Sequence, residues 1–434
     1  MYELPLAALL QVADPQRPNE TLGAFIVATI VKMIFIFTVV MIGVAYLTLL
    51  ERKVSAWIQM RLGPNRVGPR GLFQPLADGL KNIMKEETYP DAAYKPLFIM
   101  APALSFIPAL ITIAVVPFAS PAPTRWGLIP MVVADLPVGF LYILAISSLG
   151  VYGIVLAGWS SNNKYSLLGG LRSSAQMVSY EIAMGMAVVA VLLLMGNVAL
   201  TEIVARQQAM GWNVIPLLLS FFIFLVAAFA ETNRLPFDLP EAESELIAGY
   251  HTEYSAMKFS MFFIAEYANM VTASALTVSL FFGGWDIPFT QWDNAAPWSW
   301  LKTLATFAVF FVKVFFFLFT FMWVRWTLPR FRYDQLMSLG WKFMLPTALA
   351  YIVIMAGAIL ALDAYGVPTG KVWLGMISPY WVILGALNLV LAVLVFVILD
   401  RGRIISPAYS RLPAAQVERL RRIGQRRPVP AQGD

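Results

Sequence analysis

A run of acidic side chains between residues 231 and 253 is the part of this sequence that most suggests chemistry. It holds six carboxylates and one arginine: Glu231, Asp238, Glu241, Glu243, Glu245, Glu253 and Arg234. If the run is helical, Glu241 and Glu245 share one face, one turn apart. Carboxylates packed together at low dielectric cannot all ionise, so some of their pKa values rise. The run is therefore a candidate for proton storage and relay.

The alternative interpretation is an acidic loop that is simply solvated. Two observations favour the relay: the run is rich in Phe, Leu and Pro, and it leads into an apolar segment that carries Glu266. Glu181, Lys32, Asp135 and Lys313 also lie in apolar segments. Charges at membrane depth are costly and by default mark an ion or proton path. Lys32 and Asp135 lie near segment ends, where snorkelling to the membrane surface is an alternative.

A second charged segment, residues 51–85, is mainly basic. It opens with Glu51 and Arg52, and then Arg61, Arg66 and Arg70 stand among two Gly-Pro pairs, a pattern that excludes a regular helix. Apolar residues follow at helical spacing, at Leu72, Leu76, Leu80, Ile83 and Met84, with Asp78, Lys81 and Lys85 on the other face. This pattern predicts an amphipathic helix at the membrane surface. The segment is either a topological anchor or a docking surface for a cytoplasmic partner.

The elements that hold these residues are predicted to be membrane helices. Of the 434 residues 59% are hydrophobic and 13% are charged, against about 45–50% and about 25% in soluble domains. Apolar runs of membrane-spanning length cover residues 24–50, 97–118, 129–157, 175–198, 214–231, 255–283, 300–326, 342–363 and 376–399, the fifth being the shortest. The predicted fold is an all-α, polytopic membrane helical bundle with amphipathic surface helices.

The distribution of lysine and arginine predicts the orientation of the bundle. The odd-numbered loops and the tail hold 23 of the 31 basic residues, among them Arg330 and Arg332 in the seventh loop, and the other side holds 5. Basic residues concentrate in cytoplasmic loops. The N-terminus is therefore expected outside, with the odd loops and the C-terminus in the cytoplasm.

The composition also excludes several kinds of chemistry. The chain has no cysteine and one histidine, His251, which excludes thiolate-ligated iron–sulfur clusters, bis-histidine haem and histidine-cluster zinc sites. His251 is expected to be a hydrogen-bonding loop residue. No nucleotide-binding glycine motif is present. The net charge of +6 comes mostly from the arginine-rich tail, so it does not indicate nucleic acid. Electrons must be carried by other polypeptides.

Several motifs, in this order, resemble those of a known family. They are Leu50–Lys53, Gln59–Pro69, Gln74–Lys81, Glu231–Arg234 with Pro236–Asp238 and Glu241–Glu245, Ala265–Asn269 and Pro329–Met337. Over about residues 20–362 the chain is similar to the subunit designated H in bacterial NADH:quinone oxidoreductase, the equivalent of subunit 1 of mitochondrial complex I. That family usually has eight helices, so the ninth helix and the tail are additions. They either pack beside the core or hold an accessory subunit.

The resemblance implies a membrane-arm subunit that joins the hydrophilic arm, forms part of the quinone tunnel and couples quinone reduction to proton pumping. It assigns the quinone chamber to Glu51, Arg52, Trp57, Asp78, Arg234 and Phe237. It assigns the proton path to Asp78, Glu181, Glu231, Asp238, Glu241, Glu243, Glu245, Glu253 and Glu266. Docking of partner subunits is expected at Arg61, Arg66, Arg70, Arg330 and Arg332. The resemblance also implies quinone, expected to be ubiquinone, as substrate, with iron–sulfur clusters and FMN in partner subunits and no cofactor or metal bound by this chain.

The predicted organisation has four parts, in the inner membrane of a bacterium. Residues 1–23 lie outside, 24–363 form the quinone and proton domain, 364–399 add the ninth helix and 400–434 form the tail. Three alternatives are the membrane subunit of an energy-converting hydrogenase, a cation/proton antiporter and a passive membrane anchor. Against the antiporter, the sequence has no evident inverted repeat or broken helix pair.

Overall fold

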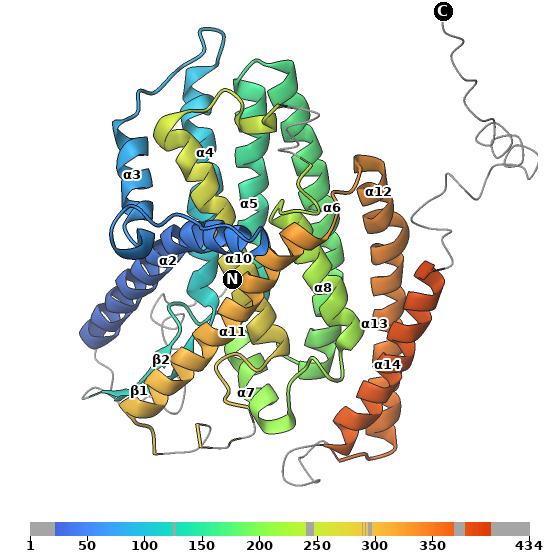
Figure 1. Cartoon of the computed structure of the whole chain (residues 1–434). Helices are drawn as coiled ribbons and strands as arrows, with labels where there is room; N and C mark the ends of the chain where they lie inside the picture. Colours follow the sequence, from blue (N-terminus) through green and yellow to red (C-terminus); the bar gives the residue numbers. More distant parts are fainter. Residues whose placement is uncertain are drawn as a thin grey trace, which may run out of the picture.

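The computed structural model of the chain describes residues 22–124, 127–239, 247–288, 290, 292–293, 297–368 and 378–400. Among these residues, eight helices are long and apolar enough to cross a membrane, and a further apolar helix, α8, has 14 residues. The helices run side by side as one bundle (Figure 1). The prediction of a polytopic membrane helical bundle is therefore confirmed, and the fifth apolar segment is the shortest helix among them.

The elements follow the predicted apolar runs closely. The helices are α2 (Leu22–Ile58), α3 (Gln74–Met84), α4 (Lys95–Ile111), α5 (Gly139–Ser160), α6 (Lys164–Met195), α7 (Leu200–Met210), α8 (Leu218–Glu231), α10 (Ala256–Phe281), α11 (Trp300–Thr327), α12 (Tyr333–Ser338), α13 (Leu345–Ala364) and α14 (Pro379–Asp400). Short 3₁₀ turns cover Pro69–Gly71, Thr112–Val115 and Gly249–His251, and a π-helical turn, Leu339–Met344, joins α12 to α13.

The start of the third predicted span is wrong. Residues 127–131 form strand β2 (Gly127–Met131), which pairs antiparallel with β1 (Ala119–Thr124), and the helix begins only at Gly139. Pro137 precedes that start and disfavours helical backbone at the residue before it. Ser120 N donates to Thr306 Oγ1 at 3.1 Å, so the hairpin packs against the start of α11. Asp135 therefore lies in a connection and accepts a hydrogen bond from Thr201.

Two other boundaries differ because of local backbone chemistry. Helix α6 begins at Lys164 rather than 175 and ends at Met195, where Gly196 takes a left-handed conformation (φ +62°). The fifth predicted span, 214–231, becomes helical only at Leu218, since residues 213–217 form turns that contain Pro216. The predicted amphipathic helix is confirmed as α3, and residues 59–68 before it are not helical.

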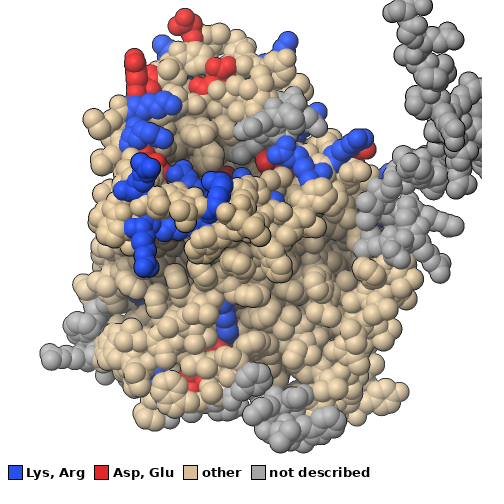
Figure 2. Space-filling view, in the orientation of Figure 1, with Lys and Arg blue, Asp and Glu red and all other residues tan. Residues whose placement is uncertain are grey.

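Close helix packing positions the loop that carries the acidic run. A Cβ placed on Gly169 of α6 would lie 2.7 Å from Gly249 Cα, so only glycine lets the Gly249–His251 turn rest on α6. Small residues allow helix backbones this close approach in membranes. Charged side chains gather on one part of the bundle, over α3 and the nearby helix ends, and most of the remaining surface in view lacks charge (Figure 2).

Candidate functional site

The centre of the site is Glu51, a carboxylate on α2 that is only 5% exposed. Arg234, from the loop after α8, places Nη1 3.1 Å from Glu51 Oε1. Tyr267 of α10 donates its hydroxyl hydrogen to Glu51 Oε2 at 2.6 Å. Arg325, in the last turn of α11, forms a further ion pair with the same carboxylate. Four segments that are distant in sequence thus meet at one buried charge.

The cluster continues from Arg234 to Glu266 of α10. Arg234 Nε lies 2.6 Å from Glu266 Oε1, and its guanidinium lies over the Tyr267 ring at 4.3 Å. Arg330 pairs at 3.0 Å with Asp238, in the first part of the acidic run. We call this set the ion-pair cluster: Glu51, Asp238, Glu266, Arg234, Arg325 and Arg330. Its three carboxylates balance three arginines; Glu51 and Arg234 are buried, whereas the side chains of Arg325 and Arg330 are about one third exposed.

The turn after α8 aims Arg234 inward. Asn233 adopts a positive φ of 50°, which asparagine tolerates better than most residues. Gln176 of α6 holds the turn, since its amide nitrogen donates to the carbonyl oxygens of Ala230 (2.8 Å) and Phe237 (2.7 Å). The chain turns at this point because the short polar segment Thr232–Arg234 follows directly after the apolar helix α8. The anchored turn fixes Arg234 between α2 and α10.

A cavity of about 390 Å³ opens between α2, α3 and α10, and we call it the α2–α3–α10 cavity. Its walls are mostly apolar and include Met41, Val44, Phe259, Phe263 and Ile264. Its polar lining includes Arg52 and Asp78, which pair at 2.7 Å. Gln74 also donates to Asp78, at 3.0 Å. Tyr267 lines the cavity and bonds to Glu51, so it joins the cavity to the ion-pair cluster.

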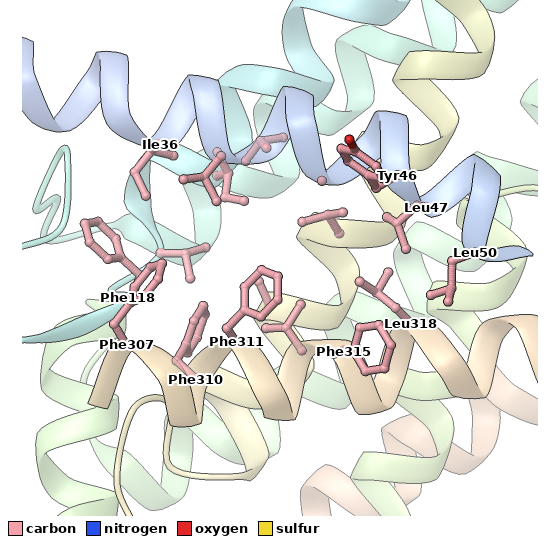
Figure 3. Close-up of a pocket in the computed structure, with 18 of the residues that line it drawn as sticks. Ile36, Tyr46, Leu47, Leu50, Phe118, Phe307, Phe310, Phe311, Phe315 and Leu318 are labelled. Carbon is pink, nitrogen blue, oxygen red and sulfur yellow. The ribbon is translucent and has the colours of Figure 1, made fainter. Parts of the chain in front are cut away.

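A second cavity, of about 400 Å³, lies between α2 and α11, and we call it the α2–α11 groove (Figure 3). Rings and aliphatic chains project into it from both helices and from the hairpin: Ile36, Leu47, Leu50, Phe118, Phe307, Phe310, Phe311, Phe315 and Leu318. Of its described lining residues, only Tyr46 and Lys53 carry polar side-chain atoms. The groove is thus equal in size to the first cavity but almost without polar groups.

A small polar cavity adjoins the ion-pair cluster on its α6 side. Glu231, Asn233, Glu266 and Asn269 are among its lining residues, and it leaves about 30 Å³ for the centres of water molecules. That is enough for a bound water with polar partners. Glu231 and Glu266 therefore line the same small cavity, which has room for a water molecule between polar groups.

Two serines of α5 continue the polar groups beyond this cavity. Glu231 hydrogen-bonds to the Ser147 side chain, and Glu181 of α6 accepts a hydrogen bond from Ser148 at 2.6 Å. Ser147 and Ser148 are adjacent in sequence. The carboxylates Glu266, Glu231 and Glu181 therefore form a series from α10 across α8 to α6.

The loop after α3 is tied to the first turn of α10. Lys258 pairs with Glu87 at 2.7 Å and lies 3.5 Å over the Tyr89 ring, while the Tyr89 hydroxyl donates to Glu87 at 2.9 Å. The hydrogen bonds from Lys258 and Tyr89 hold the pKa of Glu87 below its usual range. The tie closes the loop between the two helices that wall the α2–α3–α10 cavity.

His251 lies behind the same wall. Its ring makes edge contacts with Phe259 and Phe263, both of which line the α2–α3–α10 cavity. Burial lowers the pKa of His251 to about 4, so the ring is neutral near pH 7. It is a packing residue of the loop.

The structure brings together most of the predicted site residues. Glu51, Arg234, Glu266 and Asp238 meet in the ion-pair cluster, Arg52 and Asp78 line the adjoining cavity, and Glu231 and Glu181 follow beyond it. Arg330, predicted for docking, is exposed and pairs with Asp238, and its docking role stays a prediction. The side chains of Arg61, Arg66, Arg70 and Arg332 are exposed.

Other predicted residues lie elsewhere. Trp57 is 64% exposed at the end of α2. Phe237 is buried and stacks on Phe331 at 5.5 Å, away from the lining of either large cavity. Glu253 accepts a hydrogen bond from Asn163 at 2.7 Å. Glu241, Glu243 and Glu245 lie outside the described residues. Within the described part of the chain, no group of histidine and acidic side chains is arranged to hold a metal ion.

Sequence reasoning overlooks two members of the site. Arg325 looks from the sequence like a basic residue at a helix end, although an arginine in the last turn of a span can also reach back into the bundle. Tyr267 stands beside Glu266 in the Ala265–Asn269 motif. Its role depends on the rotation of α10 relative to α2, which the sequence does not specify.

The fold and the site define a multi-pass membrane protein with a charge-balanced, largely buried ion-pair cluster between cavities. A family model for NADH dehydrogenase matches residues 31–356. The NADH-quinone oxidoreductase subunit designated H in Leptospira biflexa is 52% identical over 343 residues, covering 77% of this chain and 95% of the relative. NADH-ubiquinone oxidoreductase chain 1 of Chondrus crispus is 50% identical over 343 residues, covering 78% and 99%.

The chain belongs to the NADH dehydrogenase family. The family expected from the motifs is thus confirmed, and with it the expectation of a membrane subunit of an NADH:quinone oxidoreductase, which is a multi-subunit enzyme. The match ends at residue 356, so α14 lies beyond it.

Proposed function

We propose that this chain forms part of the quinone-binding chamber of a proton-translocating NADH:quinone oxidoreductase and couples quinone reduction to proton pumping. The observation that carries the proposal is a continuous series of polar groups. It begins in the α2–α3–α10 cavity, passes through Tyr267 into the ion-pair cluster and continues to Glu231 and Glu181.

The α2–α3–α10 cavity suits a quinone because such a ligand has an apolar tail and a polar head. Ligand sites combine mostly apolar walls with a few convergent polar groups. Here the walls take the isoprenoid tail, with ubiquinone the expected substrate, and Arg52, Asp78 and Tyr267 supply the polar groups. The chain has no cysteine to ligate a cluster, so electrons come from iron–sulfur clusters, and ultimately FMN, in partner subunits.

Reduction consumes two electrons and two protons to give the quinol. The removal of these protons, or the negative charge of a partly reduced quinone, changes the pairing of Glu51 with its two arginines. A change in the pairing of Arg234 alters the electrostatic environment of Glu266, because the same guanidinium contacts both carboxylates. Charge interactions at low dielectric are strong over such distances. The small polar cavity then offers a hydrated step from Glu266 to Glu231, and the serines lead on to Glu181.

The charged part of the bundle is the proposed cytoplasmic side, where the hydrophilic partner subunits dock. Arg61, Arg66, Arg70 and Arg332 are exposed there, where they can meet acidic partner surfaces. In this arrangement residues 1–23 lie in the periplasm, residues 24–363 form the quinone and proton domain, and residues 400–434 lie in the cytoplasm of a bacterium with the complex in its inner membrane.

The test replaces Glu231 with Gln in the assembled complex. We expect E231Q to lower proton uptake per NADH oxidised, because the series of carboxylates is interrupted. E202Q is the matched control, since Glu202 is exposed on α7. Normal quinone reduction together with normal proton uptake in E231Q would refute the coupling role.

The three alternatives predict other results. A passive anchor predicts that E266Q leaves turnover and pumping unchanged. A hydrogenase subunit predicts no reduction of quinone that is sensitive to quinone-site inhibitors. An antiporter predicts robust ion exchange by the purified chain alone.

A further inference from the structure

Helix α14 has no role in the function proposed above, and it lies beyond the family match. It nevertheless runs along the bundle beside α13 (Figure 1). Trp381, Leu384 and Asn388 are 3%, 0% and 0% exposed, and their spacing of three, four and seven places them on one face. Leu389, Val390 and Val393 on the other side are exposed. One face of α14 is therefore built into the core.

The backbone that this face covers is irregular. Helix α8 has 14 residues, about 21 Å of helix, whereas the hydrocarbon core is about 30 Å thick. Residues 211–217, which lead into α8, are not helical, and residues 213–217 form turns. Irregular backbone at membrane depth is tolerated only where protein groups satisfy its polar atoms. This segment therefore needs hydrogen-bond donors for its carbonyl oxygens.

Helix α14 supplies two such donors. The Trp381 indole nitrogen donates to the Trp212 carbonyl oxygen at 3.2 Å, and the Asn388 amide nitrogen donates to the Pro216 carbonyl oxygen. Glycine on each side permits this close approach. A Cβ on Gly385 would lie 3.1 Å from Ile215, and a Cβ on Gly211 would lie 3.3 Å from the Trp381 ring.

Asn388 also ties the segment to α13. Its Oδ1 accepts a hydrogen bond from the Tyr351 hydroxyl at 2.6 Å, and Tyr351 is 2% exposed. The single amide thus bridges α13, α14 and the start of α8. A buried polar network of this kind fixes a packing arrangement only when its members are all satisfied.

We propose that α14 is a brace that holds the 211–217 segment, and with it the start of α8, through the positioning residues Asn388 and Trp381. Because α8 is a short rigid helix, fixing its start also fixes Glu231 at its end. This last step rests on the proposed proton path.

The test uses the full-length chain in the assembled complex and measures backbone hydrogen exchange. In N388L we expect exchange at Val214 and Leu217 to rise about tenfold, because the Pro216 carbonyl loses its donor. L389A is the matched control, a substitution of an exposed neighbour on the same helix, and it should leave exchange unchanged. Exchange in N388L equal to that of the unsubstituted chain would overturn the brace.

Two further variants keep the test informative if N388L assembles poorly. W381F retains the ring and removes only the indole N–H, so a smaller rise near Trp212 is expected. The double variant Y351F/N388L should show the same exchange rates as N388L alone, because both substitutions disrupt the same hydrogen-bond network. Additive effects of these two substitutions, or no change in W381F, would contradict the brace.

A second readout tests the step to Glu231. Proton uptake per NADH should fall in N388L while the KM for quinone stays unchanged, whereas a purely structural role would lower only the amount of assembled complex. Hydrogen exchange does not depend on turnover, so normal pumping in E231Q would refute the proton path and leave the exchange result standing.

Discussion

The two large cavities on either side of α2 have nearly the same volume, about 390 and 400 Å³, but very different linings. The α2–α3–α10 cavity contains an ion pair and a tyrosine that reaches a buried carboxylate, whereas the α2–α11 groove is walled by aliphatic and aromatic side chains. Volume alone therefore does not distinguish the two spaces. They differ in the convergent polar groups that connect one of them to a buried carboxylate, and the proposed quinone chamber rests on that difference.

The largest expected effect comes from breaking the cluster that the first cavity reaches. In E51Q two arginines lose their shared partner, and breaking a buried ion pair costs about 3–5 kcal/mol. Since about 1.4 kcal/mol is a factor of ten, a loss at the lower end of this range would make quinone reduction fall by on the order of a hundredfold. Electron transfer to a water-soluble acceptor should be unaffected. Quinone turnover within twofold of the unsubstituted enzyme would contradict the role of the cluster.

A drop in pH should raise backbone hydrogen exchange more in the wall of the α2–α3–α10 cavity than in the wall of the α2–α11 groove. The pKa of His251 is about 4 in the fold and about 6.5 when exposed, so the open state binds more protons between these values. The stability that neutral His251 provides is therefore present above pH 6.5 and is lost as pH falls toward 4. From pH 6.5 to 5.5, intrinsic-rate-corrected exchange at Phe259 should rise by about fivefold.

The corresponding control is the groove side. Exchange at Phe311 and Phe315 of α11 should show little change over the same pH range, and H251F should abolish the change at Phe259. Equal loosening of both walls would indicate a global acid effect and contradict this assignment.

Added bulk in the two cavities gives a matched comparison on one helix. Ala45 lines the α2–α3–α10 cavity and Gly43 lines the α2–α11 groove, two residues apart on α2. Filling a ligand space costs about 1 kcal/mol or more, so A45F should raise the KM for a long-tailed quinone about fivefold. G43F should leave it unchanged. A raised KM in G43F alone would exchange the roles of the two cavities.

The smallest effect is expected at the cavity mouth. The Arg52–Asp78 pair is partly exposed, and exposed ion pairs contribute about 0.2–1 kcal/mol. D78N should therefore raise the KM for quinone about threefold without changing the stability of the complex. D91N, at an exposed position of the following loop, is the control. An unaltered KM for quinone in D78N would show that the Arg52–Asp78 pair does not contribute to quinone binding.

Much of this comparison could be predicted from the sequence. Apolar runs predicted the bundle because bilayer thickness sets helix length, and the spacing of Leu76, Leu80 and Ile83 predicted α3. Intramembrane charges pointed to Glu181 and Glu266. Each of these inferences depends on local pattern alone.

What could not be predicted depends on how helices rotate and pack. The partners of Glu51 come from residues 234, 267 and 325, more than 180 positions away, and no periodicity fixes such contacts. For the same reason the sequence does not predict that Trp57 is 64% exposed or that Arg330 pairs with Asp238. The β1–β2 hairpin was missed because its apolar residues continue the pattern of the next helix.

The most direct test of the central claim is to map where a photoreactive quinone attaches in the assembled complex. If the α2–α3–α10 cavity is the quinone chamber, adducts should fall on α3 and on the first turns of α10, near Phe259 and Phe263. An excess of natural quinone should abolish them. Adducts concentrated on α11 between Phe307 and Leu318, in the α2–α11 groove, would contradict the account.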